Sequence, residues 1–149
     1  MKDSSENMAN KYIVPVDQSE HSKRAVNYAY SLCKKLDGEI IIVNVQPNYT
    51  FSPNVHRVIS KKDIEKYVEE LGKEVIELTL KDSQGQELIT EKIVLTGEPK
   101  IEITKIAKEK GAEAIVMGSR GLGPVKSAVL GSVSVGVLQL APCPVIIVP

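Results

Sequence analysis

Lys11 to Val45 reads KYIVPVDQSEHSKRAVNYAYSLCKKLDGEIIIVNV, and this stretch indicates the class of fold. Two β-branched runs, at 11–16 and 39–45, are apolar at nearly every position, as strands are when both faces of a parallel sheet are covered. Between them, apolar residues recur at helical spacing. Ser19 is the expected N-cap of that helix, and Gly38 stands just past its end. The segment is therefore predicted to be a β-α-β unit.

The rest of the chain continues this alternation of strand and helix. A second helix has Ser60 as its expected N-cap and Asp63 in the capping-box position, and a third begins at Pro99 and closes at Gly111. The remaining expected elements are strands at Leu88–Leu95, Ala112–Met117 and Val145–Val148, and a helix from about Ser132 to Leu140. Five strands and four helices in alternation predict an α/β fold, a doubly wound, Rossmann-like parallel sheet flanked by helices on both faces. Ligands are expected where strand order reverses, at the carboxyl ends of the strands.

Composition narrows the classes of function. The chain has 149 residues, and its 19 Lys plus Arg balance 19 Asp plus Glu, which gives no drive toward nucleic acid. We expect one domain at 10–149 after a disordered polar leader at 1–9, which lacks the apolar stretch of a secretory signal. A cytoplasmic location follows. The uncharged stretch Ser127–Pro149 is broken by glycine, serine and proline, so no membrane insertion is expected. Cys33 and Cys143 form no metal or disulfide pattern and are expected to be buried apolar thiols.

The stretch MGSRGLGPVKSAVLGSVS, Met117 to Ser134, carries the clearest chemical signal. Its glycines follow a buried strand and open the next helix, in the pattern Gly118-x2-Gly121-x9-Gly131-Ser132. Glycines let the backbone approach an anion, the free amides of a helix N-terminus hold it, and the helix serines can add hydroxyl donors. The spacing favours a phosphate site. In the alternative interpretation, the glycines serve only turns and the serines only cap the helix.

This glycine pattern, together with the opening PVDQSEHSKRA, the run IIIVNV, GEP, AIVMGSRG and the final CPVIIVP, resembles the universal stress protein family in its nucleotide-binding subgroup. The match covers almost the whole chain after the leader. The resemblance implies a five-stranded parallel sheet of the adenine nucleotide alpha hydrolase type. It also implies binding of ATP, or of AMP or ADP, with or without Mg²⁺, and a stress-response role as a nucleotide-dependent sensor or regulatory module.

The resemblance also implies which residues bind the nucleotide. They are Pro15, Val16, Asp17, Val45, Met117, Gly118, Arg120, Gly121, Gly131, Ser132, Val133 and Ser134. The end of the first strand would meet adenine and ribose, Val45 would contact adenine through its backbone, and the glycine and serine segments would surround ribose and phosphates. Asp17 has an alternative role as a turn or helix-capping residue. Arg120 either pairs with a phosphate or points into solvent, and Lys126 is expected to be solvated rather than bound to a triphosphate.

Two other classes of function stay open. A weak ATPase or phosphotransfer enzyme would need a carboxylate that holds a metal ion, and only Asp17 is well placed. We expect no catalytic residue and no metal ligand, since His21 and His56 lack clustered carboxylates or cysteines. A nucleotide-free dimeric scaffold is the second alternative. The last strand, Val145, Ile146, Ile147 and Val148, is expected at the sheet edge, where pairing with a second copy would cover it, and the family dimerises this way.

Overall fold

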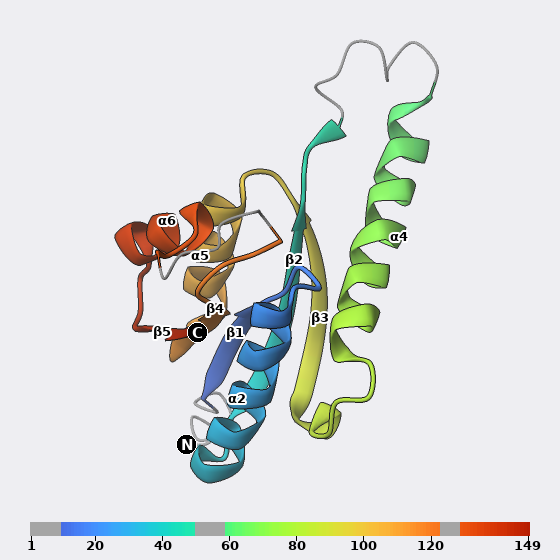
Figure 1. Ribbon diagram of the computed structural model, residues 1–149. Helices are drawn as coiled ribbons and strands as arrows, with labels where there is room; N and C mark the ends of the chain where they lie inside the picture. Colours follow the sequence, from blue (N-terminus) through green and yellow to red (C-terminus); the bar gives the residue numbers. More distant parts are fainter. Residues whose placement is uncertain (1–9, 50–58, 123–128) are drawn as a thin grey trace, which may run out of the picture.

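The computed structural model describes residues 10–49, 59–122 and 129–149. The expectations for the leader, for His56 and for Lys126 lie outside the described residues. The elements are, in order, β1 (Lys11–Pro15), α2 (Glu20–Leu36), β2 (Glu39–Gln46), α4 (Lys61–Leu80), the 3-10 turn η2 (Gln86–Leu88), β3 (Ile89–Thr96), α5 (Pro99–Lys110), β4 (Ala114–Gly118), α6 (Ser132–Leu140) and β5 (Val145–Val148) (Figure 1).

The five strands form one parallel sheet in the order β3-β2-β1-β4-β5. β1 lies at the centre, and the chain builds outward from it first on one side and then on the other. The predicted doubly wound α/β class is confirmed. Among the described strands, β5 pairs with β4 alone, so the last strand lies at a sheet edge, as the sequence indicates.

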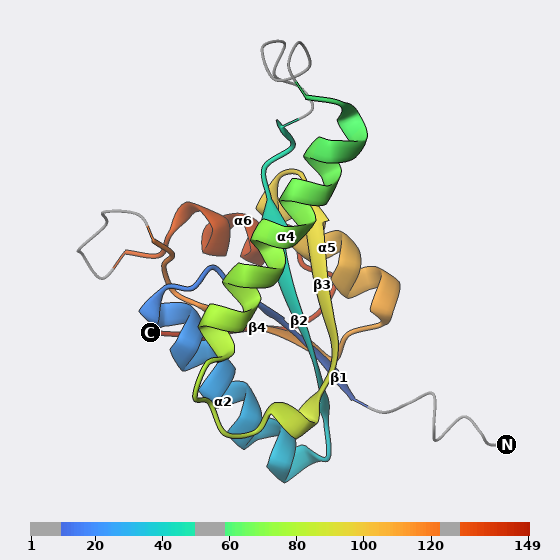
Figure 2. The ribbon, with the colours of Figure 1, turned by 90° about the vertical axis from the view of Figure 1, so that its right-hand side faces the viewer.

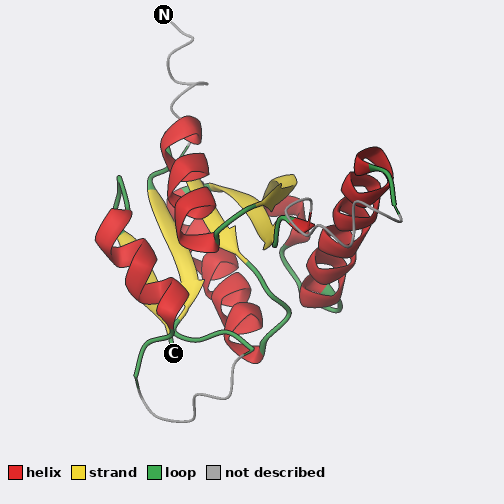
Figure 3. Ribbon diagram, turned by 90° about the horizontal axis from the view of Figure 1, so that it is seen from above, coloured by secondary structure: helices red, strands yellow, loops and turns green. Residues whose placement is uncertain are grey.

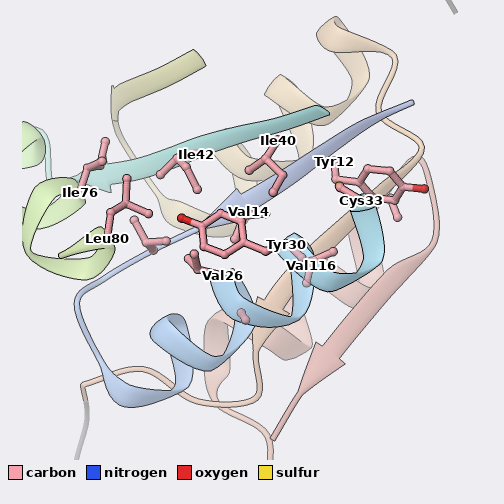
Figure 4. Close-up of a cluster of buried hydrophobic side chains, with 14 residues drawn as sticks. Tyr12, Val14, Val26, Tyr30, Cys33, Ile40, Ile42, Ile76, Leu80 and Val116 are labelled. Carbon is pink, nitrogen blue, oxygen red and sulfur yellow. The ribbon is translucent and has the colours of Figure 1, made fainter. Parts of the chain in front are cut away.

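Helices cover both faces of the sheet (Figures 2 and 3). Alternate strand residues explain this: Val14 and Ile42 pack toward α2 and α4, whereas Ile13 and Ile41 pack toward α5 and α6. Figure 4 shows the first of these clusters gathered around Tyr30 of α2. Because both faces are buried, the strands are apolar at successive positions rather than at every second one.

The expected helix ends are mostly confirmed. The Ser19 hydroxyl accepts a hydrogen bond from the Ser22 amide at 3.1 Å, and the Ser60 hydroxyl accepts one from the Asp63 amide at 3.2 Å. Gly111 closes α5 in the left-handed conformation, at φ 63°. The two serine hydroxyls satisfy amides of the first helical turn, which have no hydrogen-bond partner within the helix. Within the described residues, none of the helices combines the length and the apolar character needed to cross a bilayer.

Gly38 stands just past the end of α2, as expected. The C-cap Asp37 takes the left-handed conformation, at φ 55°, and its amide donates to the Cys33 carbonyl. Gly38 also allows close packing, because a Cβ there would lie 2.8 Å from the Tyr12 ring and 3.0 Å from Cys33 Sγ. Cys33 is fully buried as expected, but Cys143 is only half-buried, so that expectation is wrong in degree.

Candidate functional site

β1 separates from both of its neighbours at its carboxyl end. Its pairing with β4 ends at Ile13 and Ile115, and Pro15, two residues on, has no amide with which to continue that ladder. Its pairing with β2 continues to Val43, whose carbonyl accepts from the Val16 amide at 2.8 Å, and then stops. The sheet therefore opens where strand order reverses, which is where α/β proteins of this type bind ligands.

A cavity of about 310 Å³ lies in this opening. It is lined by all twelve residues that the resemblance implies for the nucleotide site: Pro15, Val16, Asp17, Val45, Met117, Gly118, Arg120, Gly121, Gly131, Ser132, Val133 and Ser134. Six further lining residues were not anticipated from the sequence: Ser22, Val43, Asn44, Pro99, Ile103 and Leu122. The geometry brings the expected residues together, and their contact with a nucleotide stays a prediction.

The two oxygens of the Asp17 carboxylate have different surroundings: Oδ1 is bonded within the turn, and Oδ2 lies at the cavity wall. Oδ1 accepts from the Ser19 amide at 3.0 Å and from the Ser22 hydroxyl at 2.7 Å, so the turn and capping role is realised. No described residue donates to Oδ2. A Cβ on Gly121 would lie 2.5 Å from Oδ2, so the glycine leaves room for this oxygen at the cavity wall. Asp17 is therefore anchored by one oxygen and has the other as an acceptor for a ligand hydroxyl.

The N-terminus of α6 forms the opposite wall. Gly131 is its N-cap and brings no side-chain hydrogen bond to the first turn. The positive end of the helix is thus open to an anion in the cavity. The Gly131 amide itself is taken, since it donates to the Ser119 carbonyl at 2.8 Å.

One expectation about this wall is wrong. The Ser134 hydroxyl is buried and donates to the carbonyls of Gly118 and Ser119, at 3.0 and 3.1 Å. It ties α6 to the end of β4 and is not an available donor for a ligand. Ser132 is exposed at the cavity, and its hydroxyl is available to donate to a ligand.

His21 lies just outside the cavity, at the first turn of α2. Its Nδ1 is 2.9 Å from the Arg24 guanidinium, which also donates through Nε to the main-chain oxygen of Pro149. Burial lowers the pKa of His21, the positive charges of Arg120 and Arg24 lower it further, and Asp17 acts in the opposite direction. The neutral ring is favoured, and it accepts from Arg24. His21 belongs to the packing of the wall, because a Cβ on Gly118 would lie 2.7 Å from its own Cβ.

Asn44 is the most informative lining residue that the sequence reasoning missed. It is 4% exposed, and its Nδ2 donates to the Val16 carbonyl at 2.8 Å. An asparagine within the apolar run IIIVNV was the available signal, because a buried amide must have a specific partner. Pro99 and Ile103 of α5 gave no such signal, since their residue types suit ordinary helix packing.

The cavity offers limited means for metal or acid–base chemistry. Among the described residues that line it, Asp17 is the one carboxylate. Across the described ranges, no three His, Cys, Asp or Glu side chains cluster as metal ligands. What the arrangement provides is an apolar slot between strands, one carboxylate oxygen, glycine backbone and a helix N-terminus.

The parallel sheet with helices on both faces, and the cavity at the point where strand order reverses, define a doubly wound α/β protein. The model of the universal stress protein family matches residues 8–149. The chain belongs to the universal stress protein family. Universal stress protein YxiE from Bacillus subtilis strain 168 is 36% identical over 147 residues, which cover 95% of this chain and 99% of that protein. Universal stress protein MJ0531 from Methanocaldococcus jannaschii is 32% identical, covering 96% of this chain and 84% of that protein.

Solved structures agree with the fold. Hypothetical protein MJ0577 superposes with a TM-score of 0.77 at 26% identity, over 95% of this chain and 96% of that one. A universal stress protein family protein from Arabidopsis thaliana with AMP bound has a TM-score of 0.63 at 24% identity, over 93% and 90% of the two chains. The universal stress protein from Archaeoglobus fulgidus in complex with dAMP has a TM-score of 0.61 at 22% identity, over 95% and 98%.

Proposed function

We propose that this chain binds an adenine nucleotide, ATP or its mono- or diphosphate, in the cavity at the carboxyl end of β1, and acts as a nucleotide-dependent sensor or regulatory module. The observation that carries the proposal is that one cavity is lined by all twelve residues that the resemblance to the family implies for the nucleotide site.

The chemistry of the cavity matches the parts of a nucleotide. The apolar slot between β1 and β2 suits a flat base, and Asp17 Oδ2 suits a ribose hydroxyl. Gly118, Gly121 and Gly131 bring backbone close to the open end of α6, which suits a phosphate.

Proteins with this fold add support of a limited kind. The Arabidopsis and Archaeoglobus proteins hold AMP and dAMP, so the fold accommodates adenine mononucleotides. Both are less than 25% identical to this chain, so the choice of ligand rests on the residues of this chain. A triphosphate and Mg²⁺ are part of the proposal, with Asp17 as the carboxylate nearest to the phosphate wall.

A regulatory role fits the cavity better than turnover does. Phosphoryl transfer needs groups that hold a metal and orient a nucleophile, and Asp17 is the one carboxylate that the described part of the chain contributes to the lining. Slow hydrolysis is the second candidate. A steady-state phosphate-release assay separates the two, because robust turnover that is lost in Asp17→Asn would make the protein an enzyme.

We also propose a homodimer through β5. The edge of β5 that faces away from β4 pairs with no strand of the described chain, and its residues Val145 to Val148 are only partly buried. Pairing with β5 of a second copy would satisfy those amides and cover those side chains. Light scattering at two concentrations tests this, and a strictly monomeric mass would contradict it. A cytoplasmic location stays a prediction.

The direct test is whether nucleotide accompanies the purified protein. Denaturation and nucleotide analysis should release ATP, AMP or ADP, and calorimetry on protein stripped of nucleotide should show binding. Gln139→Val, on an exposed face of α6 remote from the cavity lining, should bind as the wild type does. Protein that neither carries nor binds adenine nucleotide would refute the proposal and favour the dimeric scaffold.

A further inference from the structure

The pairing between β1 and β2 is ended by a side chain. In a parallel ladder, the bond from the Val16 amide to the Val43 carbonyl would be followed by one from the Val45 amide to the Val16 carbonyl. That bond is not formed, and β1 ends at Pro15. The Val16 carbonyl instead accepts from Asn44 Nδ2 at 2.8 Å. The side-chain amide of Asn44 therefore occupies the position that the backbone of the next residue would take.

The backbone of Val45 is left without a partner as a result. The amide and carbonyl of one strand residue point to the same side, and successive residues alternate. Asn44 and Gln46 direct theirs to β3, which matches the bond from the Gly97 amide to the Gln46 carbonyl. Val45 directs its own toward β1, where the sheet has opened, and it lines the cavity. No described residue bonds the Val45 amide or carbonyl.

The orientation of the Asn44 amide is determined by its neighbours. The Val16 carbonyl can only accept, so it must face the nitrogen of Asn44, and the Gln46 side chain then donates to Asn44 Oδ1 at 2.7 Å. Asn44 is 4% exposed, and both ends of its amide are bonded. The bond from the nitrogen of Asn44 is the one that occupies the Val16 carbonyl, and the bond from Gln46 adds to the order of the same amide.

We propose that Asn44 is a positioning residue for base recognition: it keeps the amide and carbonyl of Val45 free to pair with the edge of a 6-aminopurine. This inference rests on the proposed nucleotide binding. Adenine presents a donor, the 6-amino group, beside an acceptor, N1, which complements one carbonyl and one amide. Hypoxanthine, with a 6-oxo group and a protonated N1, presents the two in reversed order. Asn44 thereby sets a preference for adenine over hypoxanthine without touching the base through its own side chain.

The experiment compares Asn44→Leu with two controls. Leucine has nearly the shape of asparagine but no donor, so the Val16 carbonyl becomes free to accept from Val45. Gln46→Leu removes the second bond of Asn44 but leaves the bond to Val16. Thr79→Val removes a buried hydroxyl of α4 that bonds the Val75 carbonyl, and Thr79 does not line the cavity. Thermal unfolding of each variant separates effects on stability from effects on the site.

Two measurements decide the outcome. By NMR on nucleotide-free protein, hydrogen exchange of the Val45 amide should be fast in the wild type and about tenfold or more slower in Asn44→Leu. By calorimetry, the wild type should prefer ATP over ITP by about tenfold, the worth of one buried hydrogen bond, and Asn44→Leu should lose that preference. Gln46→Leu and Thr79→Val should keep both properties.

The contrary results are distinct. A Val45 amide that is already protected in the wild type would overturn the proposal, as would an Asn44→Leu variant that keeps the wild-type ratio of ATP to ITP affinity. If the wild type binds neither nucleotide, the proposed function fails by itself. The exchange rate at Val45 still reports in that case whether Asn44 withholds the ladder bond, since it is measured without any nucleotide.

Discussion

Gly131→Val tests the phosphate wall because neither the backbone conformation of Gly131 nor the space around its Cα opposes a Cβ. Gly131 has φ −69° and ψ 163°, a conformation that any residue adopts. An added Cβ would lie 3.4 Å from Arg120 Cα, 3.6 Å from the Ser119 carbonyl oxygen and 3.9 Å from the Gly121 amide nitrogen. These are ordinary van der Waals contacts for a Cβ. The expected loss of unfolding free energy is within about 1 kcal/mol, mostly from the poorer N-cap.

Nucleotide binding should respond much more strongly. The valine methyl groups would stand at the cavity wall between the Gly121 backbone and the first turn of α6, where the phosphate is proposed to lie. Hydrogen bonds to charged groups are worth about 1.5–3 kcal/mol each, so losing one corresponds to roughly 10- to 150-fold weaker binding.

Calorimetry with ATP, beside urea denaturation of the same samples, measures both quantities. Gln139→Val is the matched control, since it places the same side chain on an exposed part of the same helix. If Gly131→Val keeps its affinity for ATP within threefold of the wild type while folding normally, the phosphate does not lie at the start of α6.

Three further outcomes concern packing and ionisation. Gly72→Ala should lower the unfolding free energy by about 1–2 kcal/mol in urea, because its Cβ would clash with a Val94 methyl carbon, and Val94→Ala should restore part of the loss. Cys33, whose pKa is raised to about 11 by burial, should resist a thiol reagent at pH 8 until the protein unfolds, and rapid labelling of this thiol in folded protein would refute that. His21 has a lowered pKa, so the unfolded chain binds its proton more readily. Stability should therefore fall as the pH drops below about 6.5, and His21→Gln should show a shallower decline between pH 8 and 5.

The fold was predictable because the strands are apolar on both faces and the helix ends carry explicit signals. Ser19, Ser60 and Gly111 act as expected. Gly38 stands just past α2, as expected. Its second role depends on tertiary packing, because the Tyr12 ring that a Cβ at Gly38 would meet belongs to β1 and not to the helix.

The cavity was predictable to the extent that its residues are unusual for their location. Glycines after a buried strand and before a helix suggest that the backbone must approach another group closely. The resemblance to the family added the residues at the strand ends. The Ser134 hydroxyl shows where this reasoning stopped. Its partners are the carbonyls of Gly118 and Ser119, which become its neighbours only when α6 packs against the end of β4. Local spacing cannot reveal which donors are used internally.

The two-sided burial of β2 has a consequence for how the strand is aligned during folding. Ile40, Ile41, Ile42 and Val43 are all fully buried, with alternate residues in different clusters. A slip of one residue would exchange isoleucines between the two faces and change the buried apolar surface very little, so hydrophobicity hardly opposes it. It would, however, turn Asn44 away from the Val16 carbonyl and bury an amide without a partner. The hydrogen bond from Asn44 to the Val16 carbonyl, which also shapes the cavity, therefore favours the correct alignment of β1 and β2 over the slipped one.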